Sequence, residues 1–147
     1  AEEVLADYTD YYNWRLRIPF NEVNSPRNYI AKVMNYDCLI DVENSISQLD
    51  EFVRACWLCW EKRVPFGSYN ITNPGVVTTR EVAEMIDKAG LPHKDWKYFK
   101  DEAEFLEKAA LTPRANCVLD SSKIQSLGIP LTEVHDSLDW CLRNWKS

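Results

Sequence analysis

Apolar residues recur at helical spacing in several segments of the chain. The stripe between about Gln48 and Arg63 and the stripe that starts at Leu131 are the longest. They consist of Leu49, Phe52, Val53, Cys56 and Trp60, and of Leu131, Val134, Leu138, Leu142 and Trp145. A shorter stripe from Ala1 to about Tyr11 reads as the end of a longer helix. We expect each of these segments to be an amphipathic helix that buries its apolar stripe.

Capping residues predict where further helices begin. Ser25 before Pro26 indicates a helix start, because Ser can accept from free N–H groups and Pro at the first position sacrifices no hydrogen bond. Thr78 and Glu81 have capping-box spacing, and the helix that they open is expected to stop at Gly90.

The same signals predict two further helix bounds. The helix that starts at Ser25 is expected to run to about Asn35. A short helix capped by Asp120 is expected to end at Gly128.

Three short runs have the pattern of strands. Residues 14–18 alternate before Pro19, Cys38–Ile40 is a brief apolar run, and Gly67–Thr72 precedes a turn. Strands that alternate with helices predict an α/β fold, but three strands are few for a parallel sheet that is buried on both faces. We therefore expect a mostly helical part of a larger α/β fold whose N-terminal half lies outside this sequence.

Composition narrows the class of protein. The chain has 147 residues, 46% of them hydrophobic, which is enough for one domain with a core. Its net charge of −6, without a basic stripe, argues against nucleic-acid binding. No apolar run approaches the ~20 residues that span a bilayer, and the first residues lack the basic region of a signal peptide. A cytoplasmic protein without membrane contact is expected.

The usual catalytic and metal-binding motifs are not found. The glycines stand too far apart for a dinucleotide or phosphate loop, and His93 and His135 lack metal-ligand spacing. Cys56 and Cys59 form a Cys-x-x-Cys inside a predicted helix, without a second pair to complete a zinc site. Packing is the favoured interpretation of these two cysteines, with a redox or zinc role as the alternative. No metal is expected.

Isolated arginines beside small polar residues are the remaining candidate chemistry. Arg17 lies at a strand end, Arg27 precedes Asn28 at a helix start, and Arg114 shortly precedes Asn116. A diphosphate group favours this combination, because a guanidinium forks onto its oxygens and helix N–H groups add partial positive charge. A surface ion pair is the alternative for each arginine taken alone.

The motifs around these residues resemble a known family in order and spacing. The sequence resembles the C-terminal half of extended short-chain dehydrogenase/reductases that act on nucleotide sugars, and most closely the epimerase/reductases that make nucleotide-activated rhamnose. The matching motifs are Leu16-Arg17-Ile18-Pro19, Ser25-Pro26-Arg27-Asn28-Tyr29-Ile30, Asn44-Ser45, Leu49-Asp50-Glu51, Tyr69-Asn70-Ile71-Thr72-Asn73-Pro74-Gly75-Val76-Val77, and Pro113-Arg114-Ala115-Asn116 through Leu119-Asp120-Ser121-Ser122-Lys123. The likeness covers nearly the whole chain.

The resemblance implies a fold and a cofactor. It implies the C-terminal part of a Rossmann-like NAD(P)-binding fold with a small substrate-binding subdomain. In the family, an N-terminal Rossmann domain binds NADP or NAD, and a Tyr-x-x-x-Lys pair relays the proton. The chain has neither this pair nor the Gly-rich turn. No catalytic residue is therefore expected within these residues.

The resemblance also implies binding residues, carried over position by position. Residues near the nicotinamide would be Arg17, Ile18 and Pro19, and residues that face the sugar nucleotide would be Asn21, Arg27, Asn28, Lys32, Arg114 and Asn116. Of these, Arg114 matches the arginine that commonly grips the diphosphate. One departure is Glu43-Asn44-Ser45, where many sugar-nucleotide epimerases carry Arg-Asp. This departure favours the reductase or rhamnose branch.

Two hypotheses for function follow. In the first, the chain is the nucleotide-sugar-binding portion of an NAD(P)-dependent 4-keto-6-deoxy-sugar nucleotide reductase/epimerase and is not catalytic alone. In the second, it is a stand-alone binding or protein-interaction module. Under the first, the helices from Ala1 and Gln48 would expose apolar faces to an N-terminal Rossmann half or to a second copy.

Overall fold

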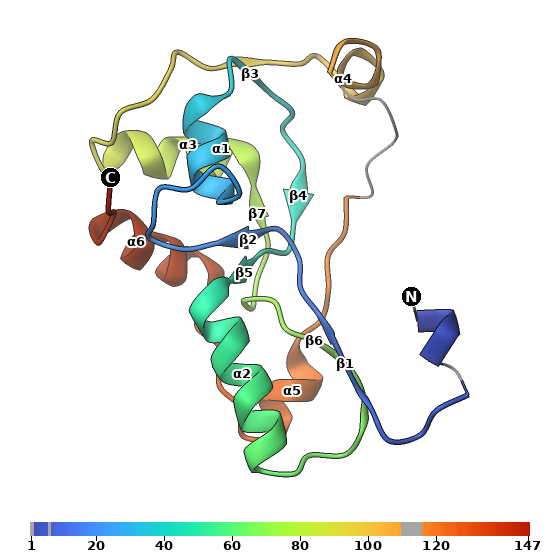
Figure 1. Cartoon of the computed structure of the whole chain (residues 1–147). Helices are drawn as coiled ribbons and strands as arrows, with labels where there is room; N and C mark the ends of the chain where they lie inside the picture. Colours follow the sequence, from blue (N-terminus) through green and yellow to red (C-terminus); the bar gives the residue numbers. More distant parts are fainter. Residues whose placement is uncertain (1, 6, 110–115) are drawn as a thin grey trace.

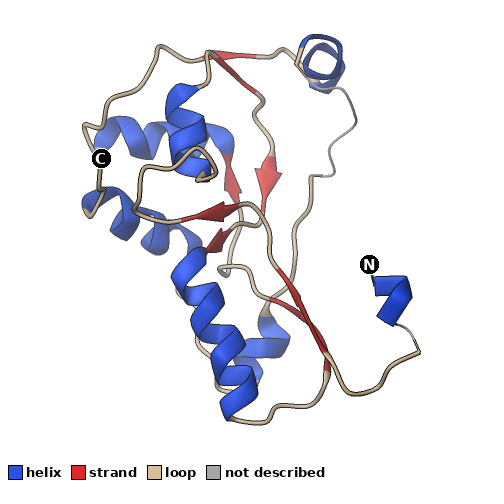
Figure 2. Ribbon diagram, in the orientation of Figure 1, coloured by secondary structure: helices blue, strands red, loops and turns tan. Residues whose placement is uncertain are grey.

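A computed structural model describes residues 2–5, 7–109 and 116–147 (Figure 1). Within this part of the chain, eight short strands form four two-stranded sheets, and six α-helices surround them (Figure 2). The predicted α/β class with little strand and mostly helix is confirmed. The prediction of three strands is too low, because most strands are two residues long and carry no sequence period.

One packing unit is built on a parallel pair of strands at the lower end of Figure 1. Strand β1 (Tyr12–Arg15) pairs in parallel with β6 (Gly67–Asn70), and the connection between them includes α2 (Leu49–Glu61). Helix α5 (Ser122–Ser126) lies against β6. The buried residues of this unit are Ala55, Cys59, Val64, Tyr69, Ile71, Ile124 and Ile129.

A second packing unit is mainly helical. Helix α3 (Thr79–Lys88) packs between α1 (Tyr29–Asn35) and α6 (Val134–Arg143). Its buried core consists of Phe20, Ile30, Val33, Met34, Leu39, Ile46, Val77, Val82, Ala83, Ile86, Val134, Leu138, Cys141 and Leu142. The core residues of α3 and α6 recur three and four positions apart, which is the spacing of one helix face.

Three small sheets hold the middle of the chain in place. Strand β2 (Pro19–Phe20) pairs with β5 (Ser47–Gln48), β3 (Cys38–Leu39) pairs with β8 (Lys97–Tyr98), and β4 (Glu43–Asn44) pairs with β7 (Val77–Thr78). The remaining elements are the 3-10 helix η1 (Glu2–Leu5) and helix α4 (Glu102–Lys108). Residues 38–48 therefore contribute a strand to each of these three sheets.

Local capping signals fix some helix ends correctly. The capping box of α3 is present: the Thr78 hydroxyl accepts from the backbone N–H of Glu81, and the Glu81 carboxylate accepts from that of Thr78. Gly90, with φ at +68°, follows α3 in the left-handed region that Gly tolerates. Gln48 caps α2, as its predicted start requires.

The predicted start of α1 is wrong. The cap is Asn28, whose side-chain oxygen accepts from the backbone N–H of Ile30, and the helix begins at Tyr29. Asn28 is preferred over Ser25 because its amide also donates to backbone oxygens of Asn21 and Val23. These contacts close the loop that precedes the helix.

The first segment and the first strand also differ from the predictions. In the described residues of the first segment, 2–5 and 7–11, only the single turn of η1 is helical, although a helix to about Tyr11 was expected. The Glu2 carboxylate instead pairs with Arg15. The strand occupies Tyr12–Arg15 and not residues 14–18, because the chain turns at Ile18.

The apolar stripe predicted for α2 combines two different faces. Ala55 and Cys59 are buried, whereas Val53 and Trp60 are 60% and 65% exposed. Together with Leu49 and Trp57, these exposed residues form a second apolar face along the helix. Periodicity alone could not separate the two faces, because both are apolar.

No helix in the described residues is both long and apolar enough to cross a membrane.

Candidate functional site

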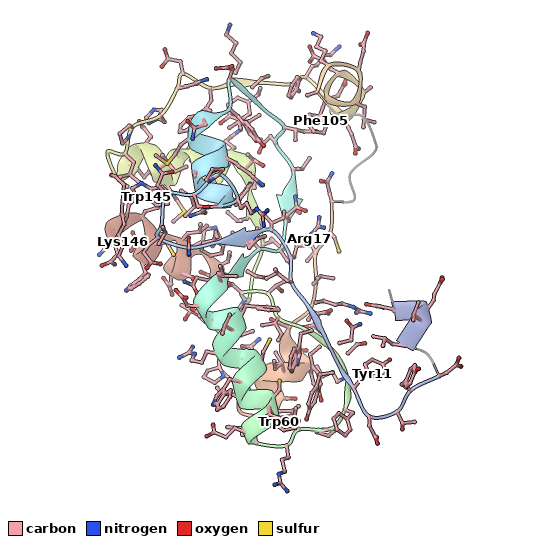
Figure 3. The ribbon with its side chains drawn as sticks, in the orientation of Figure 1. Tyr11, Arg17, Trp60, Phe105, Trp145 and Lys146 are labelled. Atoms are coloured by element: carbon pink, nitrogen blue, oxygen red, sulfur yellow. The ribbon has the colours of Figure 1, made fainter. Side chains whose placement is uncertain are left out.

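A cavity of about 500 Å³ lies between α1, the β3–β4 segment and α4. Its walls come from segments distant in sequence: Arg17 and Ile18 follow β1, Asn44 lies on β4, and Phe105 lies on α4. Figure 3 shows Arg17 beside β4 and Phe105 on α4, above it in that view. The cavity therefore forms only when the tertiary structure brings these segments together.

The polar edge of the cavity is built around Arg17. The Arg17 guanidinium donates from Nη2 to the side-chain oxygen of Asn44 at 2.6 Å. The same oxygen accepts from the backbone N–H of Cys117 at 3.2 Å, which places Asn116 at the cavity wall. A cation and two carboxamides thus border one cavity, an arrangement suited to an anionic, hydroxyl-rich ligand.

A strained corner positions Arg17 and Ile18. Ile18 has φ of 39°, in the left-handed region that a β-branched residue rarely adopts. Ser47, only 1% exposed, holds this corner: its hydroxyl accepts from the backbone N–H of Arg17, and its own N–H donates to the Ile18 carbonyl. The Ser47 hydroxyl also donates to the carbonyl of Ile71. Backbone strain of this kind persists only where surrounding contacts enforce it.

Aromatic side chains supply much of the apolar wall. Tyr29, Tyr36, Phe99 and Phe105 line the cavity, and the rings of Phe99 and Phe105 meet edge to face with centroids 5.4 Å apart. The Tyr29 hydroxyl donates to Thr79 Oγ1 at 3.3 Å, and burial raises the pKa of Tyr29 above its ordinary value. Tyr29 therefore stays neutral and offers the cavity a polarised ring face, suited to stacking a flat heterocycle.

Only some of the predicted binding residues meet at this cavity. Arg17, Ile18 and Asn116 line it. The other predicted positions that the structure describes do not: they are Pro19 in β2, Asn21, Arg27 and Asn28 in the following loop, and Lys32 on α1. Arg27 and Lys32 are exposed, whereas Asn28 is buried and caps α1. Arg114 lies outside the described residues.

The sequence interpretation missed Asn44 and the aromatic wall. Asn44 belongs to a matching motif and to a departure from the Arg-Asp pattern, but no local signal connected it with Arg17. Phe99 and Phe105 lie outside the apolar stripes and the motifs that the sequence offered. The high count of aromatic residues was the available signal, but a count cannot assign a residue to a wall or to the core.

Cys56 and Cys59 take part in packing. Both belong to the cluster between α2 and β6, Cys59 is fully buried, and both thiols are free. Burial raises the pKa of Cys56 to about 12, so its thiolate is scarce at neutral pH. In residues 2–5, 7–109 and 116–147, no group of three or more His, Cys, Asp or Glu side chains is arranged to hold a metal ion.

The sequence is similar to enzymes of nucleotide-rhamnose synthesis. It is 35% identical over 139 residues to the bifunctional dTDP-4-dehydrorhamnose 3,5-epimerase/dTDP-4-dehydrorhamnose reductase of Arabidopsis thaliana, covering 94% of this chain and 45% of that protein. It is 33% identical to a trifunctional UDP-glucose 4,6-dehydratase/UDP-4-keto-6-deoxy-D-glucose 3,5-epimerase/UDP-4-keto-L-rhamnose-reductase of the same plant, covering 94% of this chain and 20% of that enzyme. The chain thus spans less than half the length of these relatives. No protein-family model matches it.

Solved structures share the fold. The L780 UDP-rhamnose synthase of Acanthamoeba polyphaga mimivirus superposes with a TM-score of 0.84 at 23% identity, over 97% of this chain and 49% of that one. A dTDP-4-dehydrorhamnose reductase of Bacillus anthracis, solved in complex with NADP, gives a TM-score of 0.62 at 13% identity, over 92% of this chain and 47% of that one. These overlaps confirm the predicted fold class.

Proposed function

Because this chain is homologous to part of the nucleotide-rhamnose epimerase/reductases, we propose that it is the nucleotide-sugar-binding portion of an NAD(P)-dependent 4-keto-6-deoxy-sugar nucleotide reductase/epimerase. The observation that carries the proposal is the cavity in which Arg17 and two carboxamides border an aromatic wall. On this proposal, residues 1–147 form a single sugar-nucleotide-binding portion, and the chemistry needs groups from outside them.

The cavity offers a contact for each part of a nucleoside diphosphate. The Arg17 guanidinium would pair with the diphosphate, and the aromatic wall around Tyr29 and Phe105 would stack the base. Asn116 would donate to ring or ribose oxygens. Arg114 remains a proposed diphosphate ligand, because the sequence resemblance implies that role.

The residues of the loop after β2 remain proposed contacts of the sugar. Arg27 and Lys32 are exposed and free to reach an anionic ligand that extends beyond the cavity. Asn21 and Asn28 bond to each other, with Asn28 Nδ2 donating to Asn21 Oδ1 at 2.9 Å. Their part would be to hold the loop that carries Arg27.

NADP or NAD is the proposed cofactor, and it would supply the hydride when bound. The described residues could contact only the nicotinamide end of the cofactor, because the sequence has no Gly-rich turn to approach its pyrophosphate. Ile18, Pro19 and the backbone of Arg17 would border the nicotinamide, while the Arg17 guanidinium extends to the diphosphate of the sugar nucleotide; the strained corner at Ile18 would fix this orientation. The Rossmann half that holds the cofactor would come from elsewhere.

A surface on α2 supports the proposal of a second half. Leu49, Val53, Trp57 and Trp60 form an exposed apolar face, and two of them are large aromatic residues. Apolar patches of this kind mark surfaces that another polypeptide segment covers. The occupant proposed here is an N-terminal Rossmann half, with a second copy of this chain as the alternative.

The same face supports the rival function of a stand-alone protein-interaction module. That reading needs the α2 face but not the cavity. A ligand in the cavity would therefore distinguish the two functions.

Calorimetric titration of the full chain with UDP and with dTDP tests the proposal. We expect saturable binding of at least one of them, and weakening by roughly 10-fold or more in Arg17→Met, because a charged hydrogen bond to phosphate is lost. Arg143→Met is the matched control, since Arg143 is exposed on α6 and pairs with Asp139 away from the cavity. Absence of binding to either nucleotide would reject the proposal.

A further inference from the structure

Asn44 is a buried polar residue that joins two walls of the cavity. It is 8% exposed and lies on β4, which pairs with β7. Its side-chain oxygen accepts one hydrogen bond from Arg17 Nη2 at 2.6 Å and a second from the backbone N–H of Cys117 at 3.2 Å. A single atom thus links the residues that follow β1 to the segment that carries Asn116.

The neighbouring residue strengthens the second link. The backbone N–H of Ser45 donates to the Cys117 carbonyl at 3.0 Å, and the Ser45 hydroxyl accepts from the backbone N–H of Leu119 at 2.9 Å. Residues 117–119 are therefore fixed alongside Asn44 and Ser45 by hydrogen bonds at successive positions. The Asn44 oxygen also accepts from Arg17, a side chain that lines the cavity.

The backbone of Arg17 is fixed independently. Ser47 accepts from its N–H, so the side chain starts from a fixed position and Asn44 fixes its far end. Both ends of the Arg17 side chain are therefore held before a ligand binds. Because the side chain is already ordered, less conformational entropy is lost on binding.

The chemical type of the residue matters as much as its position. A carboxamide oxygen orients a guanidinium without cancelling its charge, whereas a carboxylate at the same place would form an ion pair and reduce the attraction for an anion. A Leu at the same place would bury no acceptor and leave the N–H of Cys117 without this bond. Asparagine is therefore suited to orienting the guanidinium without itself neutralising its charge.

From this geometry we infer that Asn44 is a positioning residue, which aims the Arg17 guanidinium at an anionic group of the ligand without itself forming an ion pair with it. The inference rests on the proposed function, because it assumes that a nucleoside diphosphate occupies the cavity. It attributes the orientation of the Arg17 side chain to the hydrogen bond with Asn44 on β4.

Asn44→Asp in the full chain is the principal test. Aspartate keeps an acceptor for both donors, so the fold is retained while the charge of Arg17 is offset. We expect the dissociation constant for UDP to rise by roughly 10-fold or more, with a weaker dependence on salt, because the net charge facing the diphosphate falls. Binding of uridine, which lacks the phosphates, should change by less than about 2-fold, since it makes no contact that depends on this charge.

Two further variants separate positioning from folding. Asn44→Ser shortens the acceptor so that it no longer reaches Arg17, and it should weaken UDP more than uridine. In an Arg17→Met background, Asn44→Ser should cause no further loss of UDP affinity, because the two residues act as a unit. Thermal unfolding of each variant checks that the fold is retained.

The outcomes are distinguishable. Unchanged UDP affinity in Asn44→Asp and Asn44→Ser would overturn the inference and leave the proposed function in place. Equal losses for UDP and uridine would also overturn it, since they indicate a merely structural role. If the unmodified chain bound neither UDP nor dTDP, the proposed function would fail first and the inference with it.

Discussion

Lys146 Nζ lies 2.9 Å from Glu22 Oε1, and this ion pair links the C-terminal residues to the loop that follows β2. The backbone makes the same connection: Lys146 N–H donates to the Glu22 carbonyl, and Asn24 N–H donates to the Lys146 carbonyl. Figure 3 shows Lys146 next to Trp145 at the C-terminal end of the chain. The loop proposed to face the sugar thus depends on residues more than a hundred positions away.

This contact predicts a pH dependence of stability. The hydrogen bond from Lys146 lowers the pKa of Glu22 below its ordinary 4.5. The unfolded chain therefore binds a proton at Glu22 more readily than the folded chain, and the stabilisation is complete above 4.5 and lost as the pH falls through the lowered pKa. Urea unfolding of Glu22→Gln should show a shallower loss of stability in this acid range than the unmodified chain. Parallel acid profiles of the two proteins would contradict the prediction.

Ser47→Ala should destabilise the fold. The substitution removes the acceptor for the Arg17 N–H and the donor to the Ile71 carbonyl in a fully buried place, while the strain at Ile18 remains. The expected loss in the free energy of unfolding is about 2 to 3 kcal/mol, measured by chemical denaturation. Ser126→Ala is the control, because Ser126 is exposed, and it should cost less than about 0.5 kcal/mol. Equal stability of the two variants would show that Ser47 does not hold the corner.

The five cysteines should differ in reactivity. Burial raises the pKa of both Cys56 and Cys141 to about 12, and Cys59 is fully buried. Because the thiolate is the reactive form, an alkylating reagent at neutral pH should modify these three slowly in the folded chain and rapidly after unfolding. Cys38 and Cys117 are only half-buried and should be modified first. Mass spectrometry of partly labelled protein gives the order, and early labelling at Cys56 would contradict it.

The apolar face of α2 should promote self-association of the isolated chain. Trp57 and Trp60 are each 65% exposed, so replacing either with Glu should reduce association while changing the free energy of unfolding by less than about 0.5 kcal/mol. Sedimentation velocity over a range of concentrations measures the association. Trp140→Glu is the matched control, since Trp140 is exposed on α6, a different helix. A monomer at all concentrations in the unmodified chain would remove the basis for this prediction.

Helix ends marked by capping residues could be predicted from the sequence. The Thr78 and Glu81 box gave the start of α3, and Gly90 gave its end, because capping bonds and left-handed backbone involve residues close in sequence. The start of α1 could not be predicted in this way. Asn28 replaces Ser25 as the cap because Asn28 also bonds to the preceding loop.

The candidate site was predictable only in fragments. Arg17 and Asn116 were selected from the motif resemblance, but neither motif indicates that Asn44 joins them through one oxygen atom. The aromatic wall was hidden for the same reason, since Phe99 and Phe105 pack together only after β8 and α4 form.

The sequence by itself determined where the helices of residues 49–61, 79–88 and 134–143 lie, that the fold is α/β, and which enzymes the chain resembles, because local hydrogen bonding and residue order record these properties. Tertiary structure alone decided which face of α2 is buried, where β1 ends and which side chains meet at the cavity. Those outcomes depend on contacts between segments far apart in the chain, such as Arg17 with Asn44. A contact of that kind is set by the packing of the whole molecule and leaves no periodic trace in either segment.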